Sequence, residues 1–418
     1  MKKVLSLVLA LALLLSVTSV FAEGEKVKLT MWCIATESDS NRPAYEAAIA
    51  ALKEAHPEIE FEWEAFENNS YKEKIKTAMS DPSTLPDIFF TWAGAFCGDF
   101  AAQGNVYCLE DVYKDYADQL PAVMLQNASY DVDGNGKKPY AVPLTMNIVT
   151  LFANMDLLAK AGWNEIPATY DDLMKCCDDL LAAGITPFGC AGTETWCVTE
   201  YLEPIIEKTI GYEKLNAIFA GTESWNDPAI ATAVDALQSM VTKGYFAADG
   251  LTLGNDQIRD AFAAGAYAFY QNGSWNCGKI SEAEGNFKVA LFPVMDAEKA
   301  TYGQVIGGPS DSLAVSAHSP NAELAAKIAF ELGKDICHYG YLAGAGLPAW
   351  TPDYDTAEVL PLVKDVAEIV ANADGMVLFG DTAMSADPAN IYLDYVSKVY
   401  GVELDGNAFI EGLAATLQ

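Results

Sequence analysis

The sequence predicts an α/β protein with two lobes, each built on a mainly parallel sheet flanked by helices, and with the chain crossing between the lobes. Its 418 residues exceed what one hydrophobic core usually organises. A strand, a helix and a second strand follow one another near the start, an order that favours parallel pairing. Farther along, residues 139–162 pass from one sheet environment into another without a turn.

Residues 139–162 carry the first predicted crossing. Apolar and other residues alternate from 140 to 148, as in a strand with one covered face. Residues 149–152 are continuously apolar, which is typical of a strand covered on both faces. A short helix follows, with Asn154 as its N-cap and Gly162 at its end. One extended segment therefore meets two environments, as expected where a chain passes between lobes.

The remaining elements are predicted from hydrophobic periodicity and from the glycines and prolines at their ends. Before the crossing we expect strands at residues 28–32, 59–66 and 87–92 and helices at 44–56 and 71–79. After it we expect helices at 169–183, 198–209, 212–219, 228–243, 256–265 and 321–337, strands at 186–189, 266–270 and 289–292, and a helical C-terminus.

Residues 1–22 predict a secretory signal peptide. Lys2 and Lys3 precede an apolar run at residues 4–15 that is too short for a comfortable membrane span, and Ala22 ends a cleavage site. No cysteine lies near this site, so a lipobox is absent. We therefore expect an exported protein, periplasmic or extracellular; an uncleaved anchor is the alternative.

Charge narrows the classes of partner. The net charge of −33 argues against nucleic acid and against an anionic membrane surface, because both would repel the chain. Arg42 and Arg259 are the only arginines, which disfavours a polyanionic ligand. Nucleic acid is therefore not an expected partner.

Nine cysteines in an exported chain suggest disulfides, although the number is odd. Cys97 with Cys108 and Cys190 with Cys197 are near in sequence, but the pairing stays open. Three histidines and the lack of a CxxC motif argue against a zinc site.

Residues 131–136, AspValAspGlyAsnGly, match the first half of a calcium-binding loop. The twelfth position, which should be a glutamate, is Val142. A turn is therefore the favoured interpretation, and we expect no metal and no cofactor.

Several segments resemble one family. They are Tyr-x-x-Pro at 140–143, AsnMetAspLeuLeu at 154–158, ProAlaThrTyrAspAspLeu at 167–173, and the order Phe-x-x-Gly-x-x-Ala…Gly-x-Trp at 262–275. They are similar to the extracellular solute-binding proteins of ABC sugar importers, the group that contains maltose-binding protein. The likeness spans nearly all of the chain after residue 22. It is specific for the family but not for the ligand.

The resemblance implies a two-lobe, periplasmic-binding-protein-like fold of type II with crossings at residues 139–162, 307–316 and 344–350. The N-terminal lobe would hold residues 23–145 and 305–347, and the C-terminal lobe residues 146–304 and 348–418. It also implies a monomeric receptor without catalytic residues. The receptor would capture a carbohydrate, expected to be an oligosaccharide, between its lobes and deliver it to the transmembrane subunits of an ABC permease.

A sugar site needs aromatic rings for apolar CH faces and polar groups for hydroxyls. Aromatics at strand ends are the candidates, because open α/β sheets place ligands there. Trp275 matches the stacking tryptophan of the family. Trp92 ends the third predicted strand, and Trp196 lies in a ThrGluThrTrp loop. The alternative is that these rings belong to the core.

Polar candidates lie in loops and crossings. Glu37 and Asp39 follow the first strand, Asn147 lies in the first crossing and Asp311 in the second. Arg42 could bridge a loop carboxylate or meet an acidic sugar, with a structural role slightly favoured. Loop carboxylates are usually only solvated, so their meeting around one cleft is implied by the resemblance.

Two other functions stay open at this point. A secreted glycoside hydrolase needs only a pair of carboxylates, which this acidic chain could supply. A receptor for a polyamine or a peptide would also suit acidic residues placed around aromatics.

Overall fold

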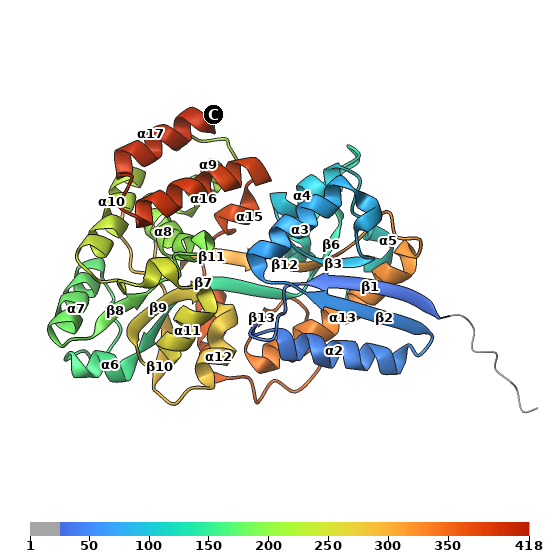
Figure 1. Cartoon of the computed structure of the whole chain (residues 1–418), viewed down its shortest axis with the longest axis horizontal. Helices are drawn as coiled ribbons and strands as arrows, with labels where there is room; N and C mark the ends of the chain where they lie inside the picture. Colours follow the sequence, from blue (N-terminus) through green and yellow to red (C-terminus); the bar gives the residue numbers. More distant parts are fainter. Residues whose placement is uncertain (1–25, 418) are drawn as a thin grey trace, which may run out of the picture.

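The computed structural model describes residues 26–417 and shows two lobes side by side, each a sheet with covering helices (Figure 1). The predicted signal peptide lies outside the described residues. Within residues 26–417, no helix combines the length and the apolar character needed to cross a bilayer. The predicted two-lobed α/β fold is confirmed.

The N-terminal lobe is built on a five-stranded sheet in the order β2-β1-β3-β12-β6. Buried and more exposed residues alternate along β1 and β2: Leu29, Met31 and Phe61 face the core, while Glu60 is exposed. The strands are β1 Val27–Cys33, β2 Ile59–Ala65, β3 Ile88–Trp92, β6 Ala141–Pro143 and β12 Asp311–Val315. The helices are α2 Arg42–Ala55, α3 Asn68–Ser80, α4 Ala95–Ala102, α5 Glu110–Tyr113 and α13 Ala322–Ala343, with 3₁₀ turns η1 Pro82–Thr84 and η2 Ala122–Ala128.

The C-terminal lobe is built on a seven-stranded sheet whose main path is β14-β11-β7-β9-β8, with β10 and β13 also paired to β7. The strands are β7 Thr145–Asn154, β8 Thr186–Gly189, β9 Tyr267–Gly273, β10 Phe287–Ala290, β11 Gln304–Pro309, β13 Leu347–Pro348 and β14 Gly375–Val377. The helices are α6 Met155–Lys160, α7 Tyr170–Ala182, α8 Thr195–Ile210, α9 Tyr212–Phe219, α10 Pro228–Thr242, α11 Asn255–Ala263, α12 Cys277–Ser281, α14 Pro361–Ala371, α15 Gly380–Ala383, α16 Ala386–Tyr400 and α17 Gly406–Thr416, with 3₁₀ turns η3 Gly250–Thr252 and η4 Ser274–Asn276.

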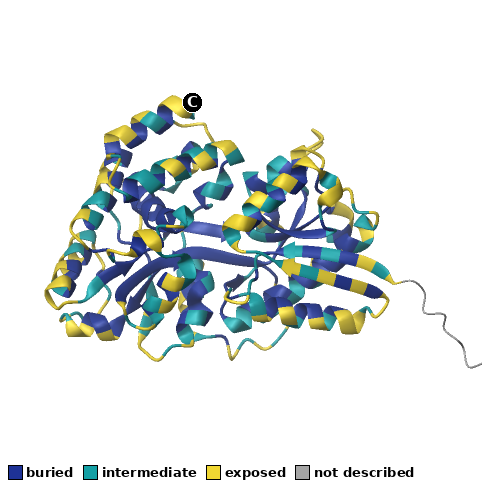
Figure 2. Cartoon of the chain, viewed as in Figure 1, coloured by how far each residue is buried: buried dark blue, intermediate teal, exposed yellow. Residues whose placement is uncertain are grey.

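Two crossings pass side by side through the centre of the molecule. The chain changes sheet at Leu144, between β6 and β7, and it changes back at Ser310, between β11 and β12. The amide of Leu144 donates to the carbonyl oxygen of Asp311 at 2.8 Å, so the two changes of sheet are bonded together. All ten residues of β7 are buried, as Figure 2 shows for the strands at the centre.

Close approach of the crossing strands requires a glycine. Gly307 of β11 pairs with Ile148 of β7 and has φ +135°, which L side chains rarely adopt. A Cβ at this position would overlap the backbone of Asn147.

A third segment also runs between the lobes. After α13, Leu347 of β13 pairs with Met146 of β7 in the second sheet. Trp350 then packs in the core of the N-terminal lobe, where its indole N–H donates to the carbonyl oxygen of Pro143 at 2.8 Å. Helix α14 begins at Pro361 in the other lobe.

The expectation of mainly parallel sheets is wrong. Only two pairings in each sheet are parallel: β1 with β2 and β3, β11 with β14, and β8 with β9. Every pairing of β7 is antiparallel, as are those of β12 with β3 and β6. The reason is that the outgoing and returning crossings run in opposite directions and pair with each other.

Other expectations differ in detail. The strand expected at 289–292 begins two residues earlier, at Phe287, and β14 lies within the expected helical C-terminus. The lobe boundaries expected at 305 and 347 fall at strands β11 and β13, which pair with β7 in the second sheet. How the chain divides between lobes stays a prediction.

Residues 131–136 form the loop of a small hairpin, between β4 Ser129–Tyr130 and β5 Lys138–Pro139, which confirms the turn. In it the ammonium of Lys138 binds Asp133 at 2.7 Å. All nine cysteines are free thiols, so neither near-sequence pair is bonded.

Candidate functional site

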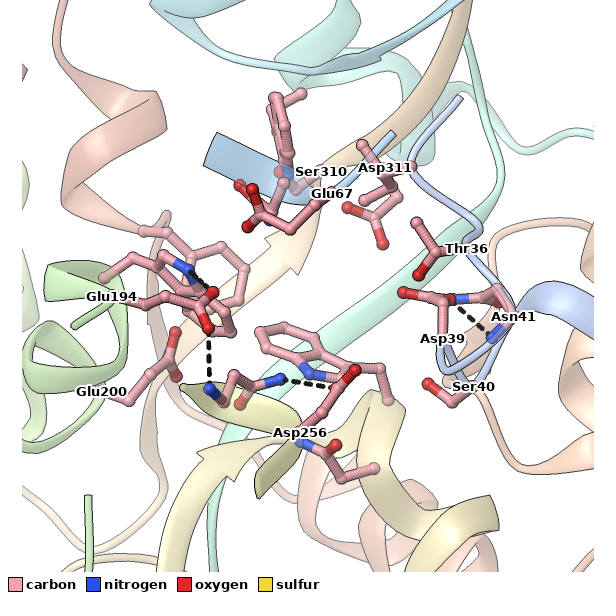
Figure 3. Close-up of a pocket in the computed structure, with 18 of the residues that line it drawn as sticks. Thr36, Asp39, Ser40, Asn41, Glu67, Glu194, Glu200, Asp256, Ser310 and Asp311 are labelled. Carbon is pink, nitrogen blue, oxygen red and sulfur yellow. Dashed lines mark hydrogen bonds between the residues drawn. The ribbon is translucent and has the colours of Figure 1, made fainter. Parts of the chain in front are cut away.

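A cavity of about 390 Å³ lies between the lobes and takes its walls from both. Its size falls in the range of about 300–1,000 Å³ that is usual for small-molecule sites. The N-terminal lobe supplies the loop after β1, the start of α3, the end of β3 and the junction of β11 with β12. The C-terminal lobe supplies the start of α8, the first turns of α11, the turn η4 and the segment at α15. In Figure 3 polar side chains from these segments surround one space.

Three aromatic rings of the C-terminal lobe form one wall. The ring centroid of Trp275 lies 6.0 Å from that of Trp196 and 5.9 Å from that of Phe379, with tilted planes. These three residues come from η4, α8 and the loop before α15, so three separate segments build the wall. We call Trp196, Trp275 and Phe379 the aromatic wall.

Gly273 explains the Gly-x-Trp spacing. The indole of Trp275 folds back over this glycine, and a Cβ at position 273 would overlap the ring. Only a residue without a side chain leaves the ring in this position. The local sequence therefore sets where the indole lies.

Trp92 lies in the opposite lobe and is almost buried, with 7 % of its surface exposed. Its ring packs edge-on against Tyr71, Phe90 and Phe96. The ammonium of Lys72 lies 4.7 Å from the ring centroid. Trp92 thus lines the cavity while also belonging to the core of its lobe.

Asp39 and Asp311 are half-buried carboxyls that line the cavity from the N-terminal lobe. Burial, together with the charge of Asp256, raises the pKa of Asp39 to about 6, although the N–H of Asn41 opposes the shift. Burial and the neighbouring Asp39 raise the pKa of Asp311 to about 7, against a hydrogen bond from Thr145 at 3.3 Å. The negative charge of Asp39 therefore makes Asp311 harder to ionise.

Glu194 hydrogen-bonds to two segments of the cavity, the start of α8 and the start of α11. Its carboxylate accepts the N–H of Asn255, at the start of α11, at 2.7 Å and the indole N–H of Trp196 at 3.0 Å. Burial raises the pKa of Glu194. These bonds fix the first turn of α11 beside the aromatic wall.

Both cations of the cavity are held by carboxylates. Lys72 of α3 binds Asp381 of α15 at 2.8 Å, an ion pair that joins the two lobes. Arg259 binds Asp256 at 2.8 Å and Asp260 at 2.9 Å. Its guanidinium also donates to the carbonyl oxygen of Ser38 across the cleft at 3.4 Å.

Several buried polar atoms of the cavity have no hydrogen-bond partner among residues 26–417. They are Oδ1 of Asn41, Asn68 and Asn276, Oε2 of Glu200 and Oγ of Ser310. All of them can accept hydrogen bonds. Buried polar groups are normally paired, so these atoms indicate a ligand that supplies donors.

Three predicted site residues do not line the cavity. Glu37 is exposed, next to lining residues Thr36 and Ser38. Arg42 begins α2, binds Glu46 at 2.7 Å and lies over the Trp63 ring at 4.5 Å. Its guanidinium also donates to the carbonyl oxygen of Ala35 at 3.2 Å.

Asn147 is buried behind the cavity and acts through its neighbours. Its amide donates to Thr145 Oγ1 at 3.0 Å and accepts from Ser274 Oγ at 2.9 Å. Thr145 in turn donates to Asp311 at 3.3 Å. We call Asp311, Thr145, Asn147 and Ser274 the hinge relay. It connects a cavity carboxyl of one lobe to the turn that presents Trp275.

Sequence reasoning missed much of the cavity. The missed lining residues with functional side chains are Glu67, Lys72, Glu194, Glu200, Asn255, Asp256, Arg259, Phe379 and Asp381. Most lie at or near the start of a helix that follows a loop. The sequence patterns that mark the beginnings of α3, α8 and α11 could have pointed to these positions. Phe379 carried no such signal, since it lies in a loop far along the chain from Trp275.

Comparison with known proteins gives the family. A family model described as "Bacterial extracellular solute-binding protein" matches residues 36–332. The chain belongs to this family. The resemblance expected from the sequence is thereby confirmed. Because the family is extracellular, this solute-binding protein is an exported one. The description of the family is that of a binding protein.

Three similar proteins illustrate the range of sequence identity and coverage within these comparisons. A multiple sugar-binding protein of Streptococcus mutans is 27% identical over 198 residues, which cover 46% of this chain and 46% of that protein, so the match spans about half of it. A solved structure from work on xylan utilization by Caldanaerobius polysaccharolyticus is 28% identical, with a TM-score of 0.88, and covers 94% of this chain and 100% of that chain. A chitin oligosaccharide binding protein has a TM-score of 0.85 at 23% identity, covers 94% of this chain and 98% of that chain, and shows the fold alone.

The glycine beneath Trp275 leads to a first prediction. Gly273→Ala should force the indole out of its position, because the new methyl group occupies the place of the ring. Acrylamide quenching of tryptophan fluorescence should increase relative to the unaltered protein. The comparable change Gly401→Ala, which meets no atom closer than 3.4 Å, should leave quenching unchanged. Identical quenching in both variants would contradict this account of the Gly-x-Trp turn.

Asp311 leads to a second prediction, on pH. Its pKa is about 7 in the folded state, against an ordinary value of 3.8, so between these values the folded state holds a proton that the unfolded state has lost. Its contribution to the free energy of unfolding is complete below pH 3.8 and is lost as the pH rises through about 7. Asp311→Asn should therefore flatten the fall in unfolding free energy over this window, measured by urea denaturation at several pH values. Asp171→Asn, at an exposed position of α7, should keep the slope of the unaltered protein; equal slopes in all three would refute the assignment.

Proposed function

We propose that this protein is the substrate-binding component of an ABC importer that captures a carbohydrate, an oligosaccharide in particular, between its lobes. The observation that carries the proposal is the aromatic wall facing unpartnered acceptor atoms from both lobes. Sugars present apolar CH faces to aromatic rings and hydroxyl donors to acceptors. The cavity offers both kinds of group together.

The similar proteins support this ligand class. The relatives include a multiple sugar-binding protein and a chitin oligosaccharide binding protein, and the structure from work on xylan utilization shares 28% identity over nearly the whole chain. The transmembrane permease subunits are the proposed partners, and the protein would act as a monomer. Export by the predicted signal peptide at residues 1–22, without a lipid anchor, belongs to the same proposal.

Closure of the two lobes is the proposed mechanism. A ligand that bonds to both lobes favours the form in which both walls contact it, in proportion to its differential affinity for that form. The chain passes from one sheet to the other at Leu144 and at Ser310, so these adjacent crossings are the natural hinge. The permease would then distinguish the loaded form by its closed surface.

A thermal-shift panel of mono- and oligosaccharides tests the proposal. A true ligand at about 100 times its dissociation constant adds about 2.7 kcal/mol to the unfolding free energy. Stabilisation by at least one saccharide is expected. A panel in which only polyamines or peptides stabilise the protein would replace the sugar proposal, and release of reducing ends from oligosaccharides by pure protein would point to a hydrolase.

Trp275 provides the matched test of the site. For a saccharide that binds, Trp275→Ala should weaken binding by about 1 kcal/mol or more, because the central ring of the aromatic wall is lost. Titration calorimetry measures the change. Trp163→Ala serves as control, because that indole pairs with Asp179 and Lys175 away from the cavity. Equal affinities of the Trp275 variant and the unaltered protein would remove this ring from the site.

A further inference from the structure

The cavity carries an uneven charge. Its lining holds seven carboxyl groups and two cationic groups. The acidic residues are Asp39, Glu67, Glu194, Glu200, Asp256, Asp311 and Asp381, and the basic residues are Lys72 and Arg259.

Both cations are already engaged. Lys72 is paired with Asp381, and Arg259 with Asp256 and Asp260. A ligand carboxylate could reach either cation only by competing with a carboxylate of the protein. The cavity therefore offers no unused positive charge among its described lining residues.

Five carboxyl groups remain without an ion-pair partner in residues 26–417. Four accept hydrogen bonds from neutral groups: Asp39 from Asn41 N, Glu67 from Asn69 N and Ser70 N, Glu194 from Asn255 N, and Asp311 from Thr145 Oγ1. Figure 3 shows these side chains around the same space. These donors are neutral, so none of them adds positive charge to the site.

Glu200 is the fifth of these carboxyl groups, and it differs from the other four in its deep burial and its unpartnered oxygen. It is 3 % exposed on α8, lines the cavity, and its Oε2 has no partner. Burial, and after it the nearby carboxyls of Glu203 and Asp381, raise the pKa of Glu200. The side chain is ready to exchange a hydrogen bond with a ligand hydroxyl or amine.

Like charges in a closing cavity oppose a further negative charge more strongly than in water. Closure removes solvent, and the interaction between charges grows as the effective dielectric constant falls. A neutral hydroxyl donates to these acceptors without such a penalty. An ammonium group donates and also reduces the repulsion among the carboxylates.

We infer that the cavity selects glycans by charge: it binds neutral glycans and glycans bearing a protonated amine, and it rejects those bearing a carboxylate. This inference rests on the proposed function and narrows its ligand class. Selectivity of this kind comes from repulsion built into the site rather than from one added contact.

Matched saccharides test the inference on the full-length exported protein. Glucose, galactose, maltotriose and a β-1,4-linked trisaccharide form the neutral set. Each is compared with a form in which one hydroxymethyl is oxidised to a carboxylate and with a form in which one hydroxyl is replaced by an amine. Calorimetry at pH 7.5 gives each dissociation constant. For each neutral sugar that binds, we expect the carboxylate form to bind at least about tenfold more weakly and the amine form no more weakly.

A double variant distinguishes the effect of the charge of the cavity from the effect of its shape. Asp39→Asn with Asp311→Asn removes two carboxylates but keeps nearly the same volume, so the ratio of carboxylate to neutral dissociation constants should fall by about threefold or more. Asp171→Asn with Glu358→Gln, both at exposed positions outside the cavity, removes the same charge and should leave that ratio unchanged. Equal effects of the two double variants would overturn the inference, because only net charge would then matter.

The outcomes distinguish the two levels of the proposal. A neutral sugar that binds while its carboxylate form binds less than tenfold more weakly overturns the charge selection and leaves the sugar receptor standing. An amine form that binds more weakly than the carboxylate form has the same consequence. If no saccharide of any charge binds, the proposed function itself falls, and the charge selection falls with it.

Discussion

The burial of β7 is the constraint on which the rest of the structure depends. All ten residues of this strand are buried, and it pairs with β9, β10, β11 and β13. A strand without an exposed face must satisfy its polar groups inside the protein. The polar side chains of Thr145 and Asn147 do so through the hinge relay, which runs from Asp311 to Ser274. The same bonds that satisfy the strand therefore fix the cavity carboxyl and the turn of Trp275 relative to each other.

The hinge relay and the cavity differ in how completely their polar side chains are hydrogen-bonded. Behind the cavity the polar atoms of the relay side chains bond to one another, while inside it Asn68, Glu200, Asn276 and Ser310 each leave an atom unpartnered. Unpaired buried groups cost free energy that a well-matched ligand can recover. The polar side chains of the crossing strands are thus hydrogen-bonded within the protein, and the atoms without partners lie on the surface that would meet the ligand.

Much of the fold could be predicted from the sequence, because the buried face of a helix or strand places apolar residues at regular intervals along the chain. The alternation of β2 and the continuous apolar run of β7 were both readable, and the change of sheet falls within residues 139–162 as expected. Strand direction was not readable in this way. The antiparallel pairing of β7 with β11 joins segments about 160 residues apart along the chain, and no local pattern records such a partner.

The sequence by itself determined most of the elements, the two lobes and the family, because hydrophobic periodicity and motifs are carried by residues near one another in the chain. Only the tertiary structure decided the membership of the cavity. In the structure Phe379 packs against Trp275, and Lys72 pairs with Asp381. Asn147, which was expected to contact the ligand, lies instead in the hinge relay. The physical reason is that a wall between two lobes is assembled from several crossings of the chain, and which side chains share it depends on how those crossings pack.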